Sequence, residues 1–430
     1  MAAARAFEQA ADGATEVTLV TRAPWAPVKA LLPAVAAGNL DPRLAVAPIR
    51  PLLRATRVII AEVIGVDAVS RQVQLAGREV QAGLTPASLP YDDVLLALGA
   101  APAATPPALS FGGLDGALAL RERLLRALED ASIEESPRKR KILTTAVILG
   151  DDLAACALAG ELLHALRSAA AHWPRLERDD PRVVLASPGA PLPQAPVALR
   201  DRVQGALASL GVEVLRDASC THLAADHLIL HRAGQDQRIE ARLVLSTRSP
   251  EAPAALGSLR TAGLVGVEAS LASGTFPGLW AAGSCAAGPG AAGLPEEHRV
   301  RAHRAARNIL AGARGGALDP RDAPGVFRAF ALAPGVAVGA LGPLPLPPAL
   351  AWRLWFLREL RRWWPGAGWL DALAPGGAPG LLASGATEVP DPYRTPFPPG
   401  VLPLPPALDD RTALGMPFTL PLPPPSVPRR

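Results

Sequence analysis

The sequence predicts an α/β fold in which a second domain is inserted into the first. Three patterns in the 430-residue chain lead to this prediction. A complete βαβ unit runs from strand to helix to strand between residues 146 and 185. A helix at 2–10 leads into a β-rich strand at 16–20, and two short apolar runs, 94–99 and 278–284, each lead into a turn that contains glycine. Since a domain holds about 150 residues, the length allows two or three domains.

The composition excludes several classes of protein. With 49% hydrophobic residues the chain buries sizeable cores, so disorder is excluded for most of it. There are 43 Lys and Arg against 39 Asp and Glu, and the high pI reflects arginine rather than a nucleic-acid-binding surface. No apolar stretch reaches the roughly 18 residues of a spanning helix, and the first residues lack the hydrophobic segment of a signal peptide.

The cysteines and histidines indicate no metal site. Cys156, Cys220 and Cys285 are too few and too widely spaced for a disulfide framework or a four-ligand zinc site. This spacing favours either a reducing compartment or thiols without a role. The seven histidines form no closely spaced ligand pair with a supporting carboxylate, so no metal is expected.

Apolar periodicity and turn residues define the elements in order. In the first part, β-branched runs predict strands and Gly38 stops a helix. In the second part, the turn at 150–152 joins a strand to the helix at 153–167, and Gly211 ends another helix. The elements expected besides those named above are helices at 29–37, 114–131, 198–210 and 295–310, strands at 57–64, 72–75, 212–215, 227–230, 238–241 and 243–245, and a connector at 101–113.

This order of elements gives a domain organisation. Residues 1–110 and 260–320 form the first domain, and residues 140–255 form the inserted one. Residues 321–385 form a C-terminal docking segment, and residues 386–430 are so rich in proline that an extended tail is expected.

The segment 349–369 holds five of the eight tryptophans. On a helical wheel its apolar arc is flanked by arginines, a composition typical of a helix that lies in the headgroup layer of a membrane. An ordinary helix packed on the domain or on a partner subunit is the alternative, because tryptophans also suit protein interfaces. The residues expected to contact the membrane are Trp352, Phe356, Leu360, Trp363 and Trp364.

The same order of motifs resembles the type II NAD(P)H:quinone oxidoreductases, flavoproteins with two Rossmann-like dinucleotide-binding domains. The resemblance covers roughly residues 1–370 and depends on order and spacing rather than on one stretch. It implies FAD on the first domain, NADH or NADPH on the second, and a quinone from the membrane. It also implies a peripheral membrane location. The compartment, which could be a mitochondrion or a plastid, and the possibility of a homodimer are left open. The segments that carry it are KALLPAVAAGNL (29–40), YDDVLLALGA (91–100), AVILGDDLAACALAGEL (146–162) and LWAAGS (279–284).

The resemblance also assigns site residues, and several depart from the family pattern. The chain begins inside the first helix, so the first strand and its glycine-rich turn are missing from the expected FAD domain, and Thr21 stands where a carboxylate binds the ribose. Aspartates at 151 and 152 would repel a diphosphate. The residues assigned are Gly99, Ala100, Gly283 and Ser284 on the FAD side, and Gly150, Asp152, Ala155 and Ser187 on the NAD(P)H side.

These departures predict an NAD(P)H:quinone oxidoreductase-like protein with reduced or lost activity. The alternatives are a non-catalytic structural or assembly subunit and a chain that lacks its true N-terminus. The glycines at 99, 150 and 283 are also explained by tight strand ends that need positive φ or small volume, with or without a cofactor. Glu161 is either a site carboxylate or a solvated helix residue, and Lys29 is either an active-site cation or a surface one.

Overall fold

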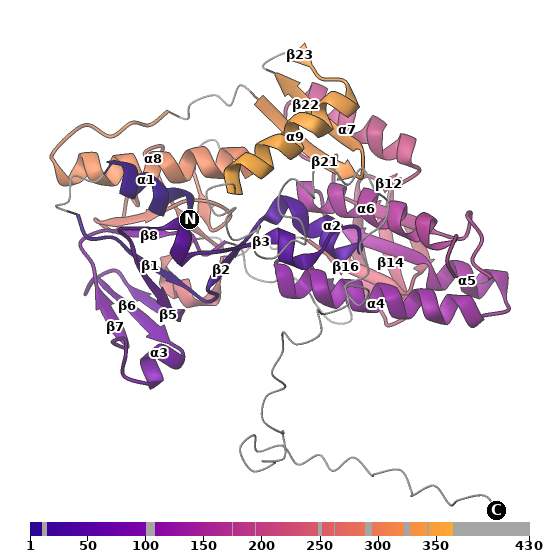
Figure 1. The fold of residues 1–430 in the computed structure, drawn as a ribbon, viewed down its shortest axis with the longest axis horizontal. Helices are drawn as coiled ribbons and strands as arrows, with labels where there is room; N and C mark the ends of the chain where they lie inside the picture. Colours follow the sequence, from indigo (N-terminus) through magenta and orange to yellow (C-terminus); the bar gives the residue numbers. More distant parts are fainter. Residues whose placement is uncertain are drawn as a thin grey trace, which may run out of the picture. The chain divides into compact units, whose positions relative to one another are not determined.

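The computed structural model describes residues 1–10, 15–99, 108–173, 175–193, 195–247, 252–261, 263–288, 295–321, 327–341 and 344–363. Every described residue belongs to one compact unit. The predicted α/β class is confirmed, because parallel strands alternate with helices in this unit (Figure 1). The expected tail at 386–430 lies outside the described residues.

The part that contains the N-terminus joins strands from distant regions of the sequence. One two-stranded parallel sheet pairs β1 with β4, and another pairs β8 with β19, so that Leu95 lies opposite Trp280. Helices α1 and α8 lie side by side (Figure 1), and Phe7, Trp280 and Ile309 share one core cluster. The elements are α1 (Ala2–Ala10), β1 (Thr18–Thr21), β4 (Arg57–Ile60), β8 (Val94–Leu96), β19 (Leu279–Ala281) and α8 (Pro295–Ala313).

Smaller sheets complete this part. The strand expected at 57–64 is two strands, because β4 ends at Ile60 and an antiparallel meander begins at Glu62. The remaining elements are β2 (Trp25–Pro27), η1 (Lys29–Leu31), α2 (Leu32–Ala36), η2 (Pro42–Ala45), β3 (Val46–Pro48), η3 (Arg50–Leu52), β5 (Glu62–Asp67), β6 (Gln72–Ala76), α3 (Arg78–Gln81), β7 (Ser88–Pro90), η4 (Ala254–Leu259), β17 (Arg260–Thr261), β18 (Leu264–Gly266) and β20 (Ala286–Ala287).

The second part is built on a five-stranded parallel sheet of order β12-β11-β10-β16-β9. Its central strand, β10, is buried along almost its whole length because helices pack on one face of the sheet and an antiparallel sheet packs on the other. The edge strand β9 lies inside the stretch that the sequence predicts to be a connector. The elements are β9 (Leu109–Ser110), α4 (Leu114–Ile133), α5 (Pro137–Leu143), β10 (Thr145–Leu149), α6 (Leu153–Ala169), β11 (Arg182–Ala186), α7 (Val197–Leu210), β12 (Glu213–Leu215) and β16 (Leu243–Ser246).

An antiparallel sheet packs beside these strands. The hairpin expected at 227–241 is present as β14 and β15, and a preceding strand, β13, joins it. Leu228 and Leu230 of β14 are buried in a core cluster with Val147 and Val244 of the parallel sheet. The strands are β13 (Ala218–Leu223), β14 (His227–Arg232) and β15 (Gln235–Glu240).

The C-terminal part of the described chain is a three-stranded antiparallel sheet followed by a helix. The sheet packs on α6, where a Cβ at Gly160 would collide with the carbonyl oxygen of Leu332. Arg202 of α7 also donates to the carbonyl of Gly339, 3.3 Å away. The elements are β21 (Phe327–Ala333), β22 (Val336–Leu341), β23 (Leu344–Pro345) and α9 (Pro348–Trp363).

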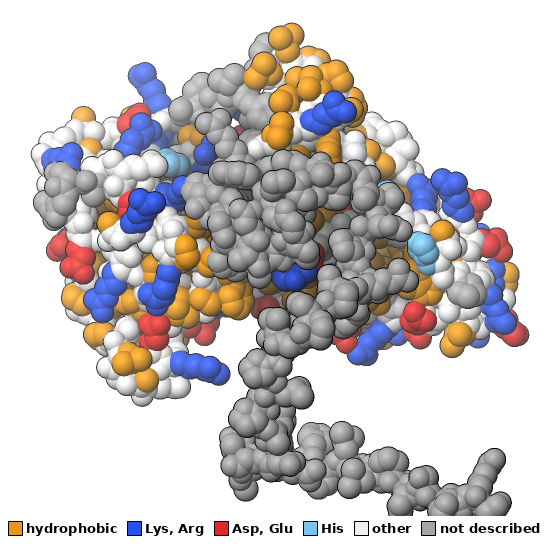
Figure 2. Space-filling model, viewed as in Figure 1, with side chains coloured by type: hydrophobic (Ala, Val, Ile, Leu, Met, Phe, Trp, Pro, Cys, Tyr) orange, Lys and Arg blue, Asp and Glu red, His pale blue; other side chains and the backbone are white. Residues whose placement is uncertain are grey.

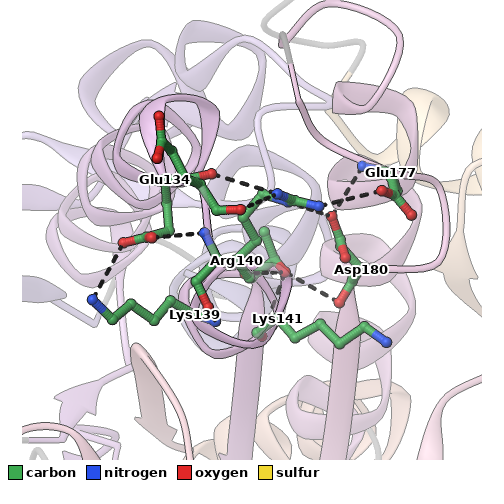
Figure 3. A network of polar contacts seen from close by, with 9 residues as sticks. Glu134, Lys139, Arg140, Lys141, Glu177 and Asp180 are labelled. Atoms are coloured by element: carbon green, nitrogen blue, oxygen red, sulfur yellow. Dashed lines mark hydrogen bonds and ion pairs between the residues drawn. The ribbon is translucent and has the colours of Figure 1, made fainter.

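A buried ion pair between Arg140 and Asp180 lies at the end of the parallel sheet where β10 and β11 begin (Figure 3). The guanidinium of Arg140, which is 6% exposed, donates from Nε to Asp180 at 3.3 Å and from a terminal nitrogen to Glu177 at 3.2 Å. It also donates to the carbonyl of Glu135 at 3.1 Å, while the hydroxyl of Thr144 donates to the carbonyl of Asp180 at 3.1 Å. This network fixes α5 and the segment before β11 to the sheet.

Candidate functional site

Two glycines lie just beyond the ends of β8 and β19. Gly99 has a φ of +76° and Gly283 a φ of +88°, a backbone conformation that favours glycine. A Cβ on either residue would meet no atom of the described residues within 4 Å. Backbone conformation, not crowding, therefore explains these glycines, and the described residues leave the space beside them open. Ser284 follows with an exposed side chain, whereas Ala100 lies outside the described residues.

Positive charge gathers close to this edge. The pKa of His298 on α8 is lowered to about 4, first by burial and then by the charges of Lys29 and Arg301. Burial raises the pKa of the Cys285 thiol, whose sulfur lies 3.4 Å from the carbonyl of Leu96. Lys29 opposes that rise, so this exposed lysine lies near the open edge. A role in chemistry for Lys29 stays a prediction.

The corresponding edge of the second domain is crowded. A Cβ on Gly150 would collide with the hydroxyl oxygen of Thr247 and would lie 3.1 Å from the Cβ of Ala155. Small volume therefore explains Gly150, and the space that a glycine offers is filled by the chain's own threonine.

Asp152 is the N-cap of α6. Its carboxylate accepts a hydrogen bond of 2.8 Å from the backbone N–H of Ala155. A free N–H group and a positive partial charge are what a helix N-terminus offers to a phosphate. Here the carboxylate of Asp152 itself accepts the hydrogen bond from the N–H of Ala155.

Ser187 follows β11 and is completely buried. Its N–H donates to the carbonyl of Leu215, and its carbonyl accepts from the N–H of Ala218, both at 2.9 Å. Its hydroxyl has no hydrogen-bond partner among the described residues. Ser187, which stands where the resemblance implies a ribose-binding carboxylate, is therefore buried inside the domain.

Helix α9 presents two different faces. Trp355 is 5% exposed and Ala351 is fully buried, so these residues form the face that packs on the sheet. Trp352 and Phe356 stack on each other, with ring centroids 5.5 Å apart and planes 4° apart. The side chains of Leu360 and Trp363 are not described, and Trp364 lies outside the described residues.

A neighbouring face of α9, about 100° around the helix, carries exposed leucines. Together with two leucines at the end of the sheet they form an apolar surface, the leucine patch, which Figure 2 shows as hydrophobic side chains gathered over β23 and α9, with basic side chains among them. No helix of the described residues is long and apolar enough to cross a bilayer. The patch consists of Leu341, Leu344, Leu350, Leu354 and Leu357.

A model of the pyridine nucleotide-disulphide oxidoreductase family matches residues 1–308. The chain belongs to this family. It is 26% identical over 377 residues to the type II NADH:quinone oxidoreductase Ndh of Mycobacterium tuberculosis, across 80% of this chain and 78% of that protein. The resemblance predicted from the sequence is thereby confirmed.

Solved structures of low identity share the fold. The structure of NDH2 from Plasmodium falciparum in complex with NADH has a TM-score of 0.69 at 12% identity, covering 80% of this chain and 90% of that one. The sulfide:quinone oxidoreductase of the hyperthermophilic bacterium Aquifex aeolicus has a TM-score of 0.67 at 15% identity, covering 85% and 89%. Both likenesses support the predicted pair of dinucleotide-binding domains.

Thiol chemistry, which the family's name includes, finds little support in this member. All three cysteines are free, and Cys156 and Cys285 are buried. Burial raises the pKa of both thiols, which disfavours the reactive thiolate. Among the described residues no group of three or more His, Cys, Asp or Glu side chains could hold a metal ion.

The two domains of this family member differ in how they suit a dinucleotide. The edge at Gly99 and Gly283 has free space beside its glycines among the described residues. Thr21 stands in place of the expected carboxylate, and its hydroxyl donates to the carbonyl of Ala23 at 3.2 Å. At the second edge the carboxylate of Asp152 caps α6, and the hydroxyl of Thr247 lies against Gly150. Among the described residues, the first edge is thus less crowded at its glycines than the second.

Glu161 on α6 is buried. It is therefore not the solvated helix residue that was one of the two interpretations of the sequence. Its carboxylate accepts a hydrogen bond of 2.6 Å from the side-chain amide of Asn39, which follows α2. Burial raises the pKa of Glu161 to about 7, and the bond from Asn39 only partly opposes this. A carboxyl group that binds a proton near neutral pH thus lies where α2 meets α6, a contact that local sequence patterns do not reveal.

Proposed function

We propose that this chain is a membrane-surface protein of the type II NADH:quinone oxidoreductase kind whose cofactor sites are altered, with reduced or lost activity. In that reaction a hydride passes from NAD(P)H to FAD and electrons pass on to a membrane quinone, chemistry that the cofactor supplies. The observation that carries the proposal is the similarity to the Mycobacterium tuberculosis enzyme along 80% of the chain. The open edge at Gly99 and Gly283 supports the flavin side, and the altered turn at Asp152 supports the reduction in activity.

A structural or assembly role is the second candidate. It is favoured by one observation, the capping of α6 by Asp152 in place of a phosphate. A protein in that role would keep the fold and the leucine patch without turnover.

The purified chain is expected to contain little FAD. The ribose-binding position holds Thr21, whose hydroxyl is engaged within its own turn, and Ser284 replaces the aspartate that the resemblance implies. Absorbance in the flavin bands after gentle purification, compared with protein concentration, measures the occupancy. A stoichiometric yellow protein would contradict the expectation and would favour full enzymatic activity.

The leucine patch is proposed to attach the protein to a membrane surface. Replacing Leu350, Leu354 and Leu357 with serine should release the protein from liposomes in a co-sedimentation assay, because each buried leucine contributes about 1.5–3 kcal/mol. The exposed Arg353 on the same helix should make binding stronger on anionic lipid and weaker in salt.

The control uses a leucine and a valine that are exposed elsewhere, more so than the leucines of the patch. Replacing Leu84 and Val69 with serine removes apolar surface far from the patch in sequence and should leave sedimentation unchanged. If the unaltered chain stays in solution with both neutral and anionic liposomes, the patch covers a partner protein or a second copy of this chain, and the membrane proposal fails.

A further inference from the structure

The loop that follows β11, residues 187–193, folds back over the turn at the start of α6. Leu192 is 3% exposed and shares a core cluster with Ala155 and Cys156 of that helix. Its N–H donates to the carbonyl of Asp151 at 2.6 Å. The loop is therefore bound to the second-domain turn by both packing and hydrogen bonding.

The closed arrangement carries costs. Leu192 has a φ of +56°, a left-handed conformation that is strained for a leucine. The hydroxyls of Ser187 and Thr247 are buried without a hydrogen-bond partner among the described residues. Costs of this kind persist only where surrounding packing enforces them, here the burial of Leu192 and Ala195 in the main core.

These residues all lie at one place in the sheet. Gly150, Ser187 and Thr247 each follow a neighbouring strand, β10, β11 and β16, whose carboxyl ends meet at the same edge. In open parallel sheets this edge, where the strand order reverses, is where a dinucleotide lies. Three groups of the chain meet at this edge: Leu192 of the loop bonds the carbonyl of Asp151, the carboxylate of Asp152 caps α6, and the side chain of Thr247 lies against Gly150.

We infer that the chain's own residues occupy the nucleotide crevice of the second domain, so that this domain takes neither NADH nor NADPH. The inference deepens the proposed function, on which it rests, by naming the half-reaction that is lost. It differs from simple charge repulsion by the two aspartates, because a filled crevice stays closed after those charges are removed.

Titration of the full chain with NADH and NADPH tests the inference directly. Fluorescence and calorimetry up to about 1 mM nucleotide, the upper end of common KM values, should show no saturable binding. The variant Asp151→Gly, Asp152→Gly should show no gain, because Leu192 and Thr247 still fill the space. Saturable binding by the unaltered chain, or a gain of tenfold or more in the variant, would overturn the inference.

A stability measurement checks the filled crevice without any nucleotide. The change Ser187→Ala removes a buried hydroxyl without a partner and should raise the melting temperature by about 2 °C. Ser219→Ala, at an exposed position on β13, is the control and should change it little. A fall in the melting temperature of Ser187→Ala would show that its hydroxyl is bonded and would count against the inference. Flavin content and liposome binding do not involve this loop, so they test the proposed function separately.

Discussion

Replacing Arg140 with alanine is expected to lower the free energy of unfolding by about 3–5 kcal/mol. The guanidinium is buried against Asp180, which is itself 3% exposed. Removing one partner leaves the carboxylate of Asp180 in the interior without its cation, and it also leaves the carbonyl of Glu135 without its donor. Urea denaturation, followed by circular dichroism, measures the change.

The neighbouring basic residues supply the control. Arg138 bonds Glu240 and Lys139 lies 4.0 Å from Glu134, but both cationic side chains are mostly exposed. Replacing either with alanine should change the free energy of unfolding by less than about 1 kcal/mol. The conservative change Arg140→Lys should lower the free energy of unfolding by an amount between that of Arg140→Ala and that of the surface variants, because it keeps the charge and loses part of the hydrogen bonding. Equal effects at 138 and 140 would mean that the ion pair contributes no more than a surface pair.

Local patterns predicted the elements whose signals lie within one stretch of chain. The unit from β10 to β11 was predicted because a β-branched run, a glycine turn and a helical period follow one another. The strands β21 and β22 were not predicted, although the Pro-Gly pair between two runs of alternating residues is a turn signal. Their many alanines weaken the β pattern, and the sheet is secured by contact with α6 at Gly160.

Contacts between distant residues explain what the sequence could not show. The helical wheel of residues 349–369 identified Trp352 and Phe356 as one apolar arc, yet Trp355 is the tryptophan that packs on the sheet. A helical wheel shows which residues share a face of the helix, but it does not show which part of the protein each face contacts. Likewise the loop at Leu192 fills the second-domain edge through a hydrogen bond to Asp151, 41 residues away, which no spacing of motifs predicts.

The change Glu161→Gln is expected to stabilise the protein at high pH and to have little effect at low pH. The carboxyl has an ordinary pKa of 4.5 when unfolded and a pKa of about 7 when folded. Between these values the unfolded chain gives up the proton that the folded chain keeps, so the free energy of unfolding falls as the pH rises through this window. At 1.36 kcal/mol per unit the loss is about 3 kcal/mol above pH 7.

Glutamine removes this loss while keeping the contact with Asn39. Its amide oxygen can accept the bond that the carboxylate now accepts at 2.6 Å, and it has no charge to desolvate. The variant should therefore exceed the unaltered chain by about 3 kcal/mol at pH 8 and by less than about 1 kcal/mol at pH 5, measured by denaturation at both values. Glu122→Gln, on the exposed face of α4, is the control for the substitution and should change the free energy of unfolding by less than about 1 kcal/mol. A difference at position 161 that is the same at pH 5 and pH 8 would mean that Glu161 is ionised at both values, and that the junction of α2 and α6 does not hold a proton near neutral pH.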